Sequence, residues 1–380
     1  MFLDGNVTWA EIDLDAIRHN IQSIKLFIGE DVDVIAVLKA NAYGHGSVPI
    51  ARAAVQAGIR RLAVHRLSEA IELRNAGITV PILIMGYTPP QGANRILKAS
   101  LTPSVITLEF AEALSKLTQS NKKTIPIHIK VDTGMSRYGL MPDEVLAFAQ
   151  KIIHLPGLFL EGIFTHLATS NSADKSFVLE QLVIFNRVLD RLKSSGIEIP
   201  LIHAAASAAI AKYPEAYFNA VRLGIMLYGV KSSTGLKPPF ELHPALTLKS
   251  IVSRVRELPP GSTISYDRTY TLKQTTRVAL VPVGFGDGYP RNLSNRASVL
   301  IHGQRARIIG LICMDQFVVD INHISGVKQD DEIVLIGQQG SEMITVQELA
   351  EQADTIPYEI IAPLSSRVAR YYLRDSNQVV

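Results

Sequence analysis

Eight short apolar segments recur between residues 34 and 223, and the stretches between them have helical spacing. Continuous apolar runs of this length are typical of strands that are buried on both faces. Regular alternation of strand and helix indicates a parallel sheet, and eight such units over about 200 residues predict a (β/α)8 barrel. The predicted strands are 34–38, 61–64, 82–85, 104–106, 127–131, 158–164, 201–205 and 220–223, with helical patterns such as 68–76, 108–117, 142–154 and 176–194 between them.

The pattern changes after Gly229. Residues 231–239 are polar and rich in turn formers, which predicts a linker. Short segments of alternating hydrophobicity follow, and they predict a mostly β domain interrupted by one helix at 345–353. We therefore expect an α/β chain with the N-terminal barrel in residues 1–235 and a C-terminal β domain in residues 236–380. The segments are 246–255, 276–283, 297–301, 307–312, 317–321 and 332–336, and a further strand is predicted at 8–14, ahead of a helix that includes 15–21.

The composition excludes several classes of protein. The 380 residues include 38 basic and 35 acidic side chains, so the net charge of +3 gives no reason to expect a nucleic-acid partner. Apolar residues make up 47% of the chain, but no apolar stretch is long enough to span a bilayer, and residues 1–6 lack the pattern of a signal peptide. The single cysteine, Cys313, excludes an internal disulfide. We expect a cytoplasmic protein without a membrane partner.

Polar side chains cluster where the predicted barrel strands end. A lone histidine at such a position is usually structural, and a lone arginine is usually exposed. In a barrel, however, the carboxyl ends of all strands meet on the face that carries active sites, so the cluster as a whole predicts a site. Its members are Lys39, Lys130, Asp132, Arg137, His166, His203, Ser207, Arg222, Gly224 and Ile225.

Lys39 directly follows the first predicted strand and begins the segment Lys-Ala-Asn-Ala-Tyr-Gly-His-Gly, residues 39–46. An isolated lysine at a strand end is more often solvated than functional. At a barrel mouth, the same amine is positioned to form a Schiff base. Tyr43 supplies a hydroxyl group, and Gly44 and Gly46 let the backbone approach a ligand closely. These parts suit an aldehyde cofactor that carries a phosphate.

The segment 39–46 resembles the lysine motif of alanine racemases, and further motifs extend the resemblance over nearly the whole chain. The resemblance implies pyridoxal 5'-phosphate as the cofactor, no metal ion, and an isomerase that interconverts L-alanine and D-alanine for peptidoglycan precursors. It also implies a homodimer whose active sites are shared between the subunits, and an opening strand that belongs to the second domain.

The resemblance also implies which residues hold the cofactor. Arg222 faces the pyridine nitrogen and, being always protonated, donates a hydrogen bond to it. His166 and His203 are linked to Arg222. Ala206 replaces the asparagine that is usual in the family, which removes one polar contact. The phosphate site consists of Tyr43, Ser207, Gly224, Ile225 and Tyr358, the last in the segment 355–360.

Racemisation requires two proton-transfer groups on opposite faces of one carbon. The resemblance assigns these roles to Lys39 and to Tyr266, which the partner subunit contributes. The pKa of a solvated phenol is about 10, so Tyr266 needs nearby positive charge, which the resemblance assigns to His166. A half-buried strand tyrosine is the alternative interpretation of Tyr266.

Substrate binding is implied for Arg137 and for the backbone amide of Met314, which lies beside Asp315 in a segment that also comes from the partner. In many relatives the lysine that corresponds to Lys130 is carbamylated, and the resulting anion orients the arginine. Three positions depart from the family pattern. Asp267 replaces glycine, Phe285 replaces tyrosine and Leu311 replaces arginine, the last two near the passage into the site.

Three other functions stay open at this stage. A racemase of broader or different specificity, for example for serine, would share these motifs. A decarboxylase of basic amino acids shares the architecture but requires a catalytic cysteine motif, whereas Cys313 lies in a racemase-like segment. A non-catalytic cofactor-binding barrel would lack the second domain.

Overall fold

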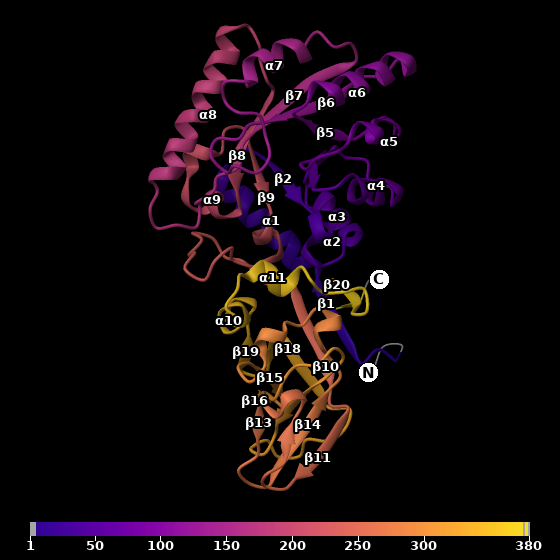
Figure 1. Cartoon of the computed structure of the whole chain (residues 1–380), viewed down its shortest axis with the longest axis vertical. Coiled ribbons are helices and arrows are strands. Elements are labelled where there is room, and N and C mark those ends of the chain that lie inside the picture. The colour runs from indigo at the N-terminus through magenta and orange to yellow at the C-terminus, as the bar shows by residue number, and fades with distance from the viewer. Residues whose placement is uncertain (1–4, 375–376, 379–380) are drawn as a thin grey trace.

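A closed barrel of eight parallel strands forms one half of the molecule (Figure 1). The computed structural model describes residues 5–374 and 377–378. The strands follow one another around the barrel in chain order, and β9 closes it by pairing with β2. This confirms the predicted barrel. The strands are β2 (Asp33–Val37), β3 (Arg61–Val64), β4 (Ile82–Ile84), β5 (Thr102–Val105), β6 (Ile125–Lys130), β7 (Leu158–Phe164), β8 (Leu201–Ala206) and β9 (Ala220–Leu223).

Helices surround the barrel strands (Figure 1). The longer helices present an apolar face to the strands, as shown by α8, in which Val178, Leu182, Phe185, Val188 and Leu192 are buried. Since the helices cover the outer surface and side chains fill the interior, the strands are buried on both faces. The helices are α1 (Leu14–Ile28), α2 (Lys39–Tyr43), α3 (Ser47–Gln56), α4 (Leu67–Asn75), α5 (Ala93–Ala99), α6 (Leu108–Asn121), α7 (Val145–Ile152), α8 (Ser176–Ser194) and α9 (Ser207–Lys212).

The second half of the molecule is built on one large sheet, in the order β11-β14-β17-β16-β15-β18-β10-β1-β20-β21, with β19 paired to β18. This confirms a mostly β C-terminal domain. Two short helices, α10 (Val346–Gln352) and α11 (Pro357–Ile361), lie between the sheet and the barrel (Figure 1). The strands are β1 (Thr8–Asp13), β10 (Leu246–Ile251), β11 (Arg254–Leu258), β14 (Thr276–Val281), β15 (Ser298–Ile301), β16 (Gln304–Ile309), β17 (Phe317–Asp320), β18 (Glu332–Gln339), β19 (Glu342–Ile344), β20 (Ala369–Arg374) and β21 (Asn377–Gln378), and a separate hairpin joins β12 (Thr263–Ile264) to β13 (Tyr270–Thr271).

Several predicted strands differ from the observed bounds, and two of these differences have a clear structural cause. The single strand expected at 246–255 is wrong, because Val252 and Ser253 form a corner: their amides bond to Asp331 O and Leu280 O, so β10 and β11 take different partners. The fourth barrel strand begins at Thr102, earlier than predicted. Pro103 is tolerated there because it lies near the start of the strand, before the pairing with β6 begins at Ser104.

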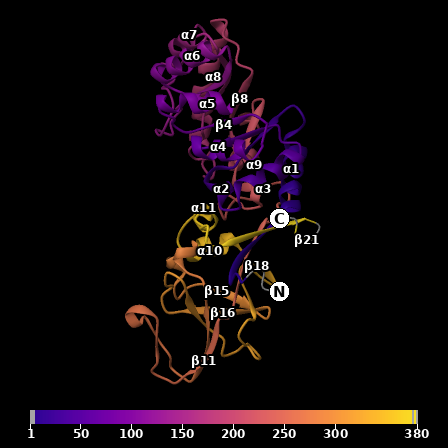
Figure 2. The ribbon, with the colours of Figure 1, turned by 90° about the vertical axis from the view of Figure 1, so that its right-hand side faces the viewer.

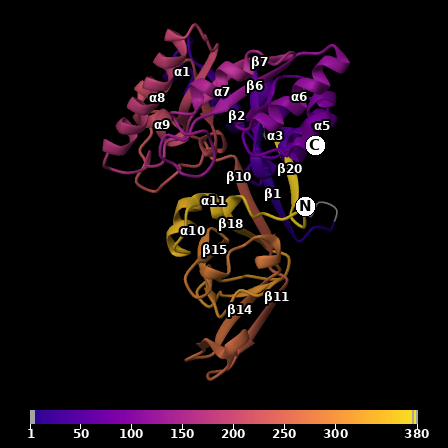
Figure 3. The same cartoon turned by 45° about the horizontal axis from the view of Figure 1, so that its top comes forward.

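Strands from both ends of the chain tie the two halves together. β1 pairs antiparallel with β10 and parallel with β20, so the first strand of the chain lies beside a strand near its C-terminal end (Figure 3). Both ends of the described chain therefore lie near the junction, and α1 follows β1 directly into the barrel (Figure 2). Across residues 5–374 and 377–378, no helix combines the length and the hydropathy that crossing a bilayer requires.

Candidate active site

A cavity of about 1250 Å³ opens at the carboxyl ends of the barrel strands. His203 lies behind its wall, where it is fully buried against Arg222. Three residues predicted for the site, Tyr266, Met314 and Asp315, belong to the C-terminal domain and are not part of this lining. The predicted residues that line the cavity are Lys39, Tyr43, Lys130, Arg137, His166, Ser207, Arg222, Gly224, Ile225 and Tyr358.

Lys39 begins a left-handed turn. Four consecutive residues without glycine, Ala40 to Tyr43, have φ between 52° and 54°. A left-handed conformation costs about 1–2 kcal/mol per L-residue, so this turn is strained. It closes through hydrogen bonds from Gly44 N to Ala40 O (3.0 Å) and from Gly46 N to Asn41 O (2.9 Å). The turn directs the chain sharply away from β2 and leaves the lysine at the barrel mouth.

The C-terminal segment offsets this strain. Arg370 Nε donates to Gly44 O (2.8 Å), and Tyr372 Oη donates to His45 O (3.0 Å). Gly44 and Gly46 make the close approach possible, because a Cβ on Gly44 would lie 2.1 Å from Ile361 O and one on Gly46 would lie 1.9 Å from Tyr372 Oη. Contacts with β20 and α11 therefore hold the backbone next to the lysine.

The cavity wall is strongly cationic. Burial, together with the charge of Arg137, lowers the pKa of Lys39. Burial and the charge of Arg222 lower the pKa of Lys130 to about 8, and its ammonium group lies over the rings of Tyr138 and Phe164. Positive groups that depress one another's pKa favour an anionic ligand. The cavity therefore suits a phosphate or a carboxylate.

Two hydroxyl groups lie close to the backbone of Gly224, which has no side chain. A Cβ there would lie 3.0 Å from Tyr43 Oη and 3.5 Å from Ser207 Oγ. Ser207 Oγ accepts hydrogen bonds from the amides of Gly224 (3.1 Å) and Met226 (3.4 Å). Tyr358, on α11, closes the same corner, with its ring 6.0 Å from that of Tyr43. Because Gly224 has no side chain, a space remains between these hydroxyls and backbone amides. Such a space fits a phosphate group.

Arg222 is almost fully buried and is held from several sides. Nη1 donates to His203 Nδ1 (2.7 Å) and to His203 O (3.0 Å), while Nη2 donates to the carbonyls of Thr165 and Ala204 (both 2.7 Å). Among the residues that the structure describes, none accepts a hydrogen bond from Nε. Because the guanidinium lines the cavity, it can offer a donor to a ligand there.

His166 is a neutral imidazole. Burial, followed by the charge of Arg222, lowers its pKa to about 3. Arg222 Nη2 lies 3.3 Å from His166 Nδ1, so this nitrogen is the acceptor and the proton is on Nε2. The positive charge that the sequence interpretation assigned to His166 therefore belongs to the arginine behind it.

Asp132 shapes the loop that carries Arg137. Its carboxylate accepts hydrogen bonds from the amides of Gly134, Ser136 and Arg137, all at 3.0 Å. Burial acts to raise the pKa of Asp132, but these amide bonds outweigh it and lower the pKa. The loop folds back around the carboxylate, and the arginine side chain lines the cavity.

Three residues predicted to come from the partner subunit, Tyr266, Met314 and Asp315, are exposed on the C-terminal domain, close to Phe285 and Leu311 of the predicted entry passage. Tyr266 is 70% exposed and begins a 3-10 turn, so its interpretation as a strand tyrosine is wrong. Ser265 Oγ donates to Leu311 O (2.7 Å), and Phe285 N donates to Cys313 O (3.1 Å). We call Tyr266, Phe285, Leu311, Met314 and Asp315 the tyrosine face.

The backbone at Asp267 explains one departure from the family pattern. Its φ of 57° lies in the left-handed region, where glycine is favoured and aspartate is tolerated better than most residues. We expect Asp267→Val to destabilise the protein by about 1–2 kcal/mol, whereas Asp267→Gly retains its stability. Thermal unfolding midpoints of the two variants test this. Asp315→Val, at another exposed aspartate, is the control, and equal destabilisation by valine and glycine at 267 would exclude a backbone cause.

Three polar residues at or beneath the site escaped the sequence interpretation. Glu69 accepts hydrogen bonds from the amides of Ala40 (2.7 Å), His65 and Arg66, and so braces the lysine turn. The sequence offered a signal for Glu69, since a glutamate in the first turn of a predicted helix often accepts hydrogen bonds from backbone amides. His128 and Glu161 lie within apolar strand sequences, and a buried polar residue in such a run is also a signal.

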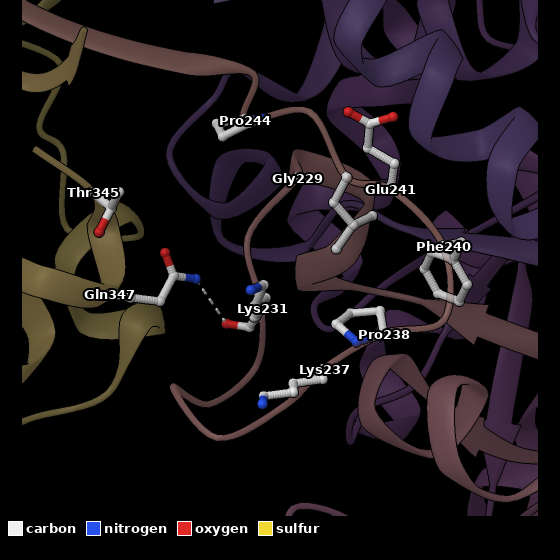
Figure 4. Close-up of a pocket in the computed structure, with 10 residues that line it drawn as sticks. Gly229, Lys231, Lys237, Pro238, Phe240, Glu241, Pro244, Thr345 and Gln347 are labelled. Atoms are coloured by element: carbon white, nitrogen blue, oxygen red, sulfur yellow. Dashed lines mark hydrogen bonds between the residues drawn. The ribbon is translucent and has the colours of Figure 1, made fainter. Parts of the chain in front are cut away.

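A second cavity, of about 390 Å³, lies between the linker and α10 (Figure 4). Gln347 reaches across it to the backbone of Lys231 (3.4 Å). Nearby, His19, Glu241 and His243 bring three potential metal-ligand atoms within 4.8 Å of one another. The two imidazole rings are stacked at 3.7 Å and are nearly parallel, so their in-plane lone pairs do not converge on one point. This arrangement does not form a metal site.

Comparison with known proteins identifies the family. Residues 12–232 match the family described as alanine racemase, N-terminal domain, and residues 245–372 match the corresponding C-terminal domain. Alanine racemases from Desulforamulus reducens and Halothermothrix orenii are 46% and 43% identical to the chain; each alignment covers 96% of it and 98% and 96% of the respective relative.

Solved structures agree over the whole chain. Alanine racemase from Bacillus anthracis with bound L-Ala-P has a TM-score of 0.93 and 39% identity, covering 100% of this chain and 98% of that one. Histidine racemase from Leuconostoc mesenteroides has a TM-score of 0.90 and 29% identity, with coverage of 98% and 99%. Both domains, in the same order, are thus common to all these proteins, and the chain belongs to the alanine racemase family.

Proposed function

We propose that this protein is a pyridoxal-phosphate-dependent alanine racemase, which interconverts L-alanine and D-alanine as a homodimer. The observation that carries the proposal is a half-buried lysine with a lowered pKa at the mouth of a cationic barrel cavity, beside a cradle suited to phosphate. The family supports the activity: eight relatives at 42–46% identity are all named alanine racemase.

The residues of the cavity divide between the two ends of such a cofactor. Tyr43, Ser207 and Tyr358, with the backbone at Gly224 and Ile225, would hold the phosphate, and Lys39 would hold the aldehyde carbon. Pyridoxal phosphate, when bound, supplies an electron-withdrawing ring that makes the α-hydrogen of an amino acid more acidic. The hydroxyls and amides of the cradle are the donors that a phosphate requires.

Arg222 controls how strong this withdrawal is. Burial lowers its pKa, yet a guanidinium stays protonated at neutral pH, so it would donate a hydrogen bond to the ring nitrogen and keep its own proton. A ring kept neutral withdraws fewer electrons than a protonated one. Arg222 would thereby disfavour side reactions and leave more of the catalysis to the two bases.

Lys39 and Tyr266 would be those bases, one on each face of the α-carbon. An amine whose pKa is lowered by burial is a better match for proton transfer near neutral pH than a solvated lysine. The tyrosine face, exposed in one chain, would cover the cavity of the other, where Arg222 behind His166 supplies positive charge close to the phenol. Arg137 and the Met314 amide would bind the substrate carboxylate.

The lowered pKa of Lys130 supports carbamylation of its amine. A pKa of about 8 leaves a share of neutral amine at neutral pH, and this is the form that attacks CO2. The new N–C bond yields a carbamate and releases one proton. We infer that the resulting anion pairs with Arg137 and orients it.

A substrate panel tests the proposed function. Purified protein loaded with pyridoxal phosphate is incubated with L-alanine, L-serine and L-histidine, and chiral chromatography measures the D-product. We expect alanine to give the highest kcat/KM and to approach equal amounts of both enantiomers from either side. Faster turnover of serine would favour the alternative of a racemase with different specificity, and no D-product from any of the three would refute the proposal.

A further inference from the structure

A line of hydrogen-bonded polar side chains runs from the cavity wall through the barrel interior. Arg222 Nη1 lies 2.7 Å from His203 Nδ1, and His203 Nε2 lies 3.1 Å from His128 Nδ1. His128 Nε2 lies 3.2 Å from Glu161 Oε2, and Glu161 Oε1 accepts from Arg61 at 2.9 Å. These residues come from β9, β8, β6, β7 and β3, so the line crosses the barrel.

The imidazoles are fixed by their surroundings. His203 is stacked on the ring of Phe164, with centroids 4.8 Å apart and planes within 5°. His128 lies flat over β7 at Gly162, where a Cβ would come within 2.5 Å of the ring. Neither ring can turn freely. The packing of each ring therefore determines which group each of its nitrogens faces.

Only one arrangement of protons satisfies every bond in the line. Arginine can only donate, so His203 Nδ1 must accept. A neutral His203 then carries its proton on Nε2 and donates to His128 Nδ1. His128 in turn carries its proton on Nε2 and donates to the carboxylate. All bonds therefore run in one direction, from the guanidinium to the anion.

The charge states agree with this direction. Burial lowers the pKa of both His128 and His203, so both are neutral. Burial acts to raise the pKa of Glu161, but the hydrogen bond from His128 and the charge of Arg61 hold it below its usual range. An ionised carboxylate at the far end can only accept, which excludes the opposite arrangement.

We propose that Glu161 and His128 are positioning residues for Arg222: the carboxylate selects the Nε2–H form of both histidines, and this leaves a lone pair on His203 Nδ1 to hold the guanidinium. With the opposite tautomer, an N–H of His203 would face an N–H of Arg222 at 2.7 Å. Two donors at that distance repel, so the arginine would have to move within the cavity wall. The predicted effect on catalysis rests on the proposed function. The predicted tautomers are independent of it.

Glu161→Gln tests the selection of the tautomer. Arg61 can only donate, so the amide oxygen of glutamine turns toward it and the NH2 group faces His128. His128 Nε2 must then accept, and the proton of each histidine moves to Nδ1. We expect 15N NMR of imidazole-labelled protein without cofactor to report Nε2–H for both rings in the wild type and Nδ1–H in the variant.

A second variant separates the tautomer from the lost charge. In Glu161→Gln/Arg61→Met the amide is free to turn its oxygen toward His128, so we expect Nε2–H to return. Arg61→Met alone, the matched control, retains Nε2–H. With pyridoxal phosphate bound, we expect kcat for alanine to fall about tenfold in Glu161→Gln, with little change in KM, and to recover in the double variant.

Several results would overturn the proposal. If NMR found the proton of His203 on Nδ1 in the wild type, the proposal would be wrong, and this test does not require any variant to fold. If the tautomers are unchanged in Glu161→Gln, the carboxylate does not select them. If the tautomers change but kcat does not, the histidines do not position Arg222 for catalysis. A wild-type protein that does not racemise alanine but has the expected tautomers would refute the proposed function alone.

Discussion

Lys39→Ala is expected to lower racemisation of alanine by more than about 10³-fold, because the change removes both the covalent attachment point and one of the two bases. The visible absorbance of lysine-bound pyridoxal phosphate should disappear with it. In the wild type, borohydride should fix the cofactor onto a peptide containing residue 39. Steady-state rates, spectra and peptide mapping measure the three effects.

Lys237→Ala is a suitable control, since Lys237 lies in the linker, at the edge of the second cavity (Figure 4). It should retain the activity, the absorbance and the labelled peptide. If the absorbance band persisted in Lys39→Ala, another amine would hold the cofactor, and Lys130 would be the first to examine because of its lowered pKa.

Tyr266→Phe is expected to lower racemisation by about 10²–10⁴-fold, the range usual for loss of a general acid–base group. The loss should be unequal on the two faces of the α-carbon. Exchange of the α-hydrogen with solvent deuterium should persist for the enantiomer that Lys39 serves and should nearly vanish for the other. Proton NMR of each enantiomer in deuterated buffer measures both rates.

Tyr270→Phe provides the matched control, because Tyr270 lies four residues further on in β13 and packs against the small apolar cluster around Ile264. It should leave both exchange rates unchanged. Equal loss on the two faces in Tyr266→Phe would count against the two-base assignment.

Mixing the two inactive variants tests whether the site is shared. A hybrid dimer of Lys39→Ala and Tyr266→Phe contains one site in which both groups are intact. Random pairing of equal amounts should therefore restore at most about a quarter of the wild-type rate. No recovery, in a mixture shown to exchange subunits, would indicate that both groups come from one chain.

The fold was predictable because its dominant signals are local. Buried parallel strands are continuous apolar runs, so all eight barrel strands could be recognised, and β3, β7 and β9 have the predicted bounds. Barrel geometry then requires that residues following these strands share one face. Hence Lys39, His166 and Arg222 could be grouped into a cavity without knowledge of any contact.

The sequence by itself thus determined the barrel, the β domain and most of the cavity wall, since strand ends in a barrel have a fixed location. Only the tertiary structure decided the left-handed turn after Lys39, because Asn41 is the one residue of Ala-Asn-Ala-Tyr that tolerates it well, and distant Arg370 and Tyr372 hold the segment that follows. It also decided the pairing of His128 with His203 and Glu161. That pairing depends on the register of neighbouring strands, which no local pattern encodes.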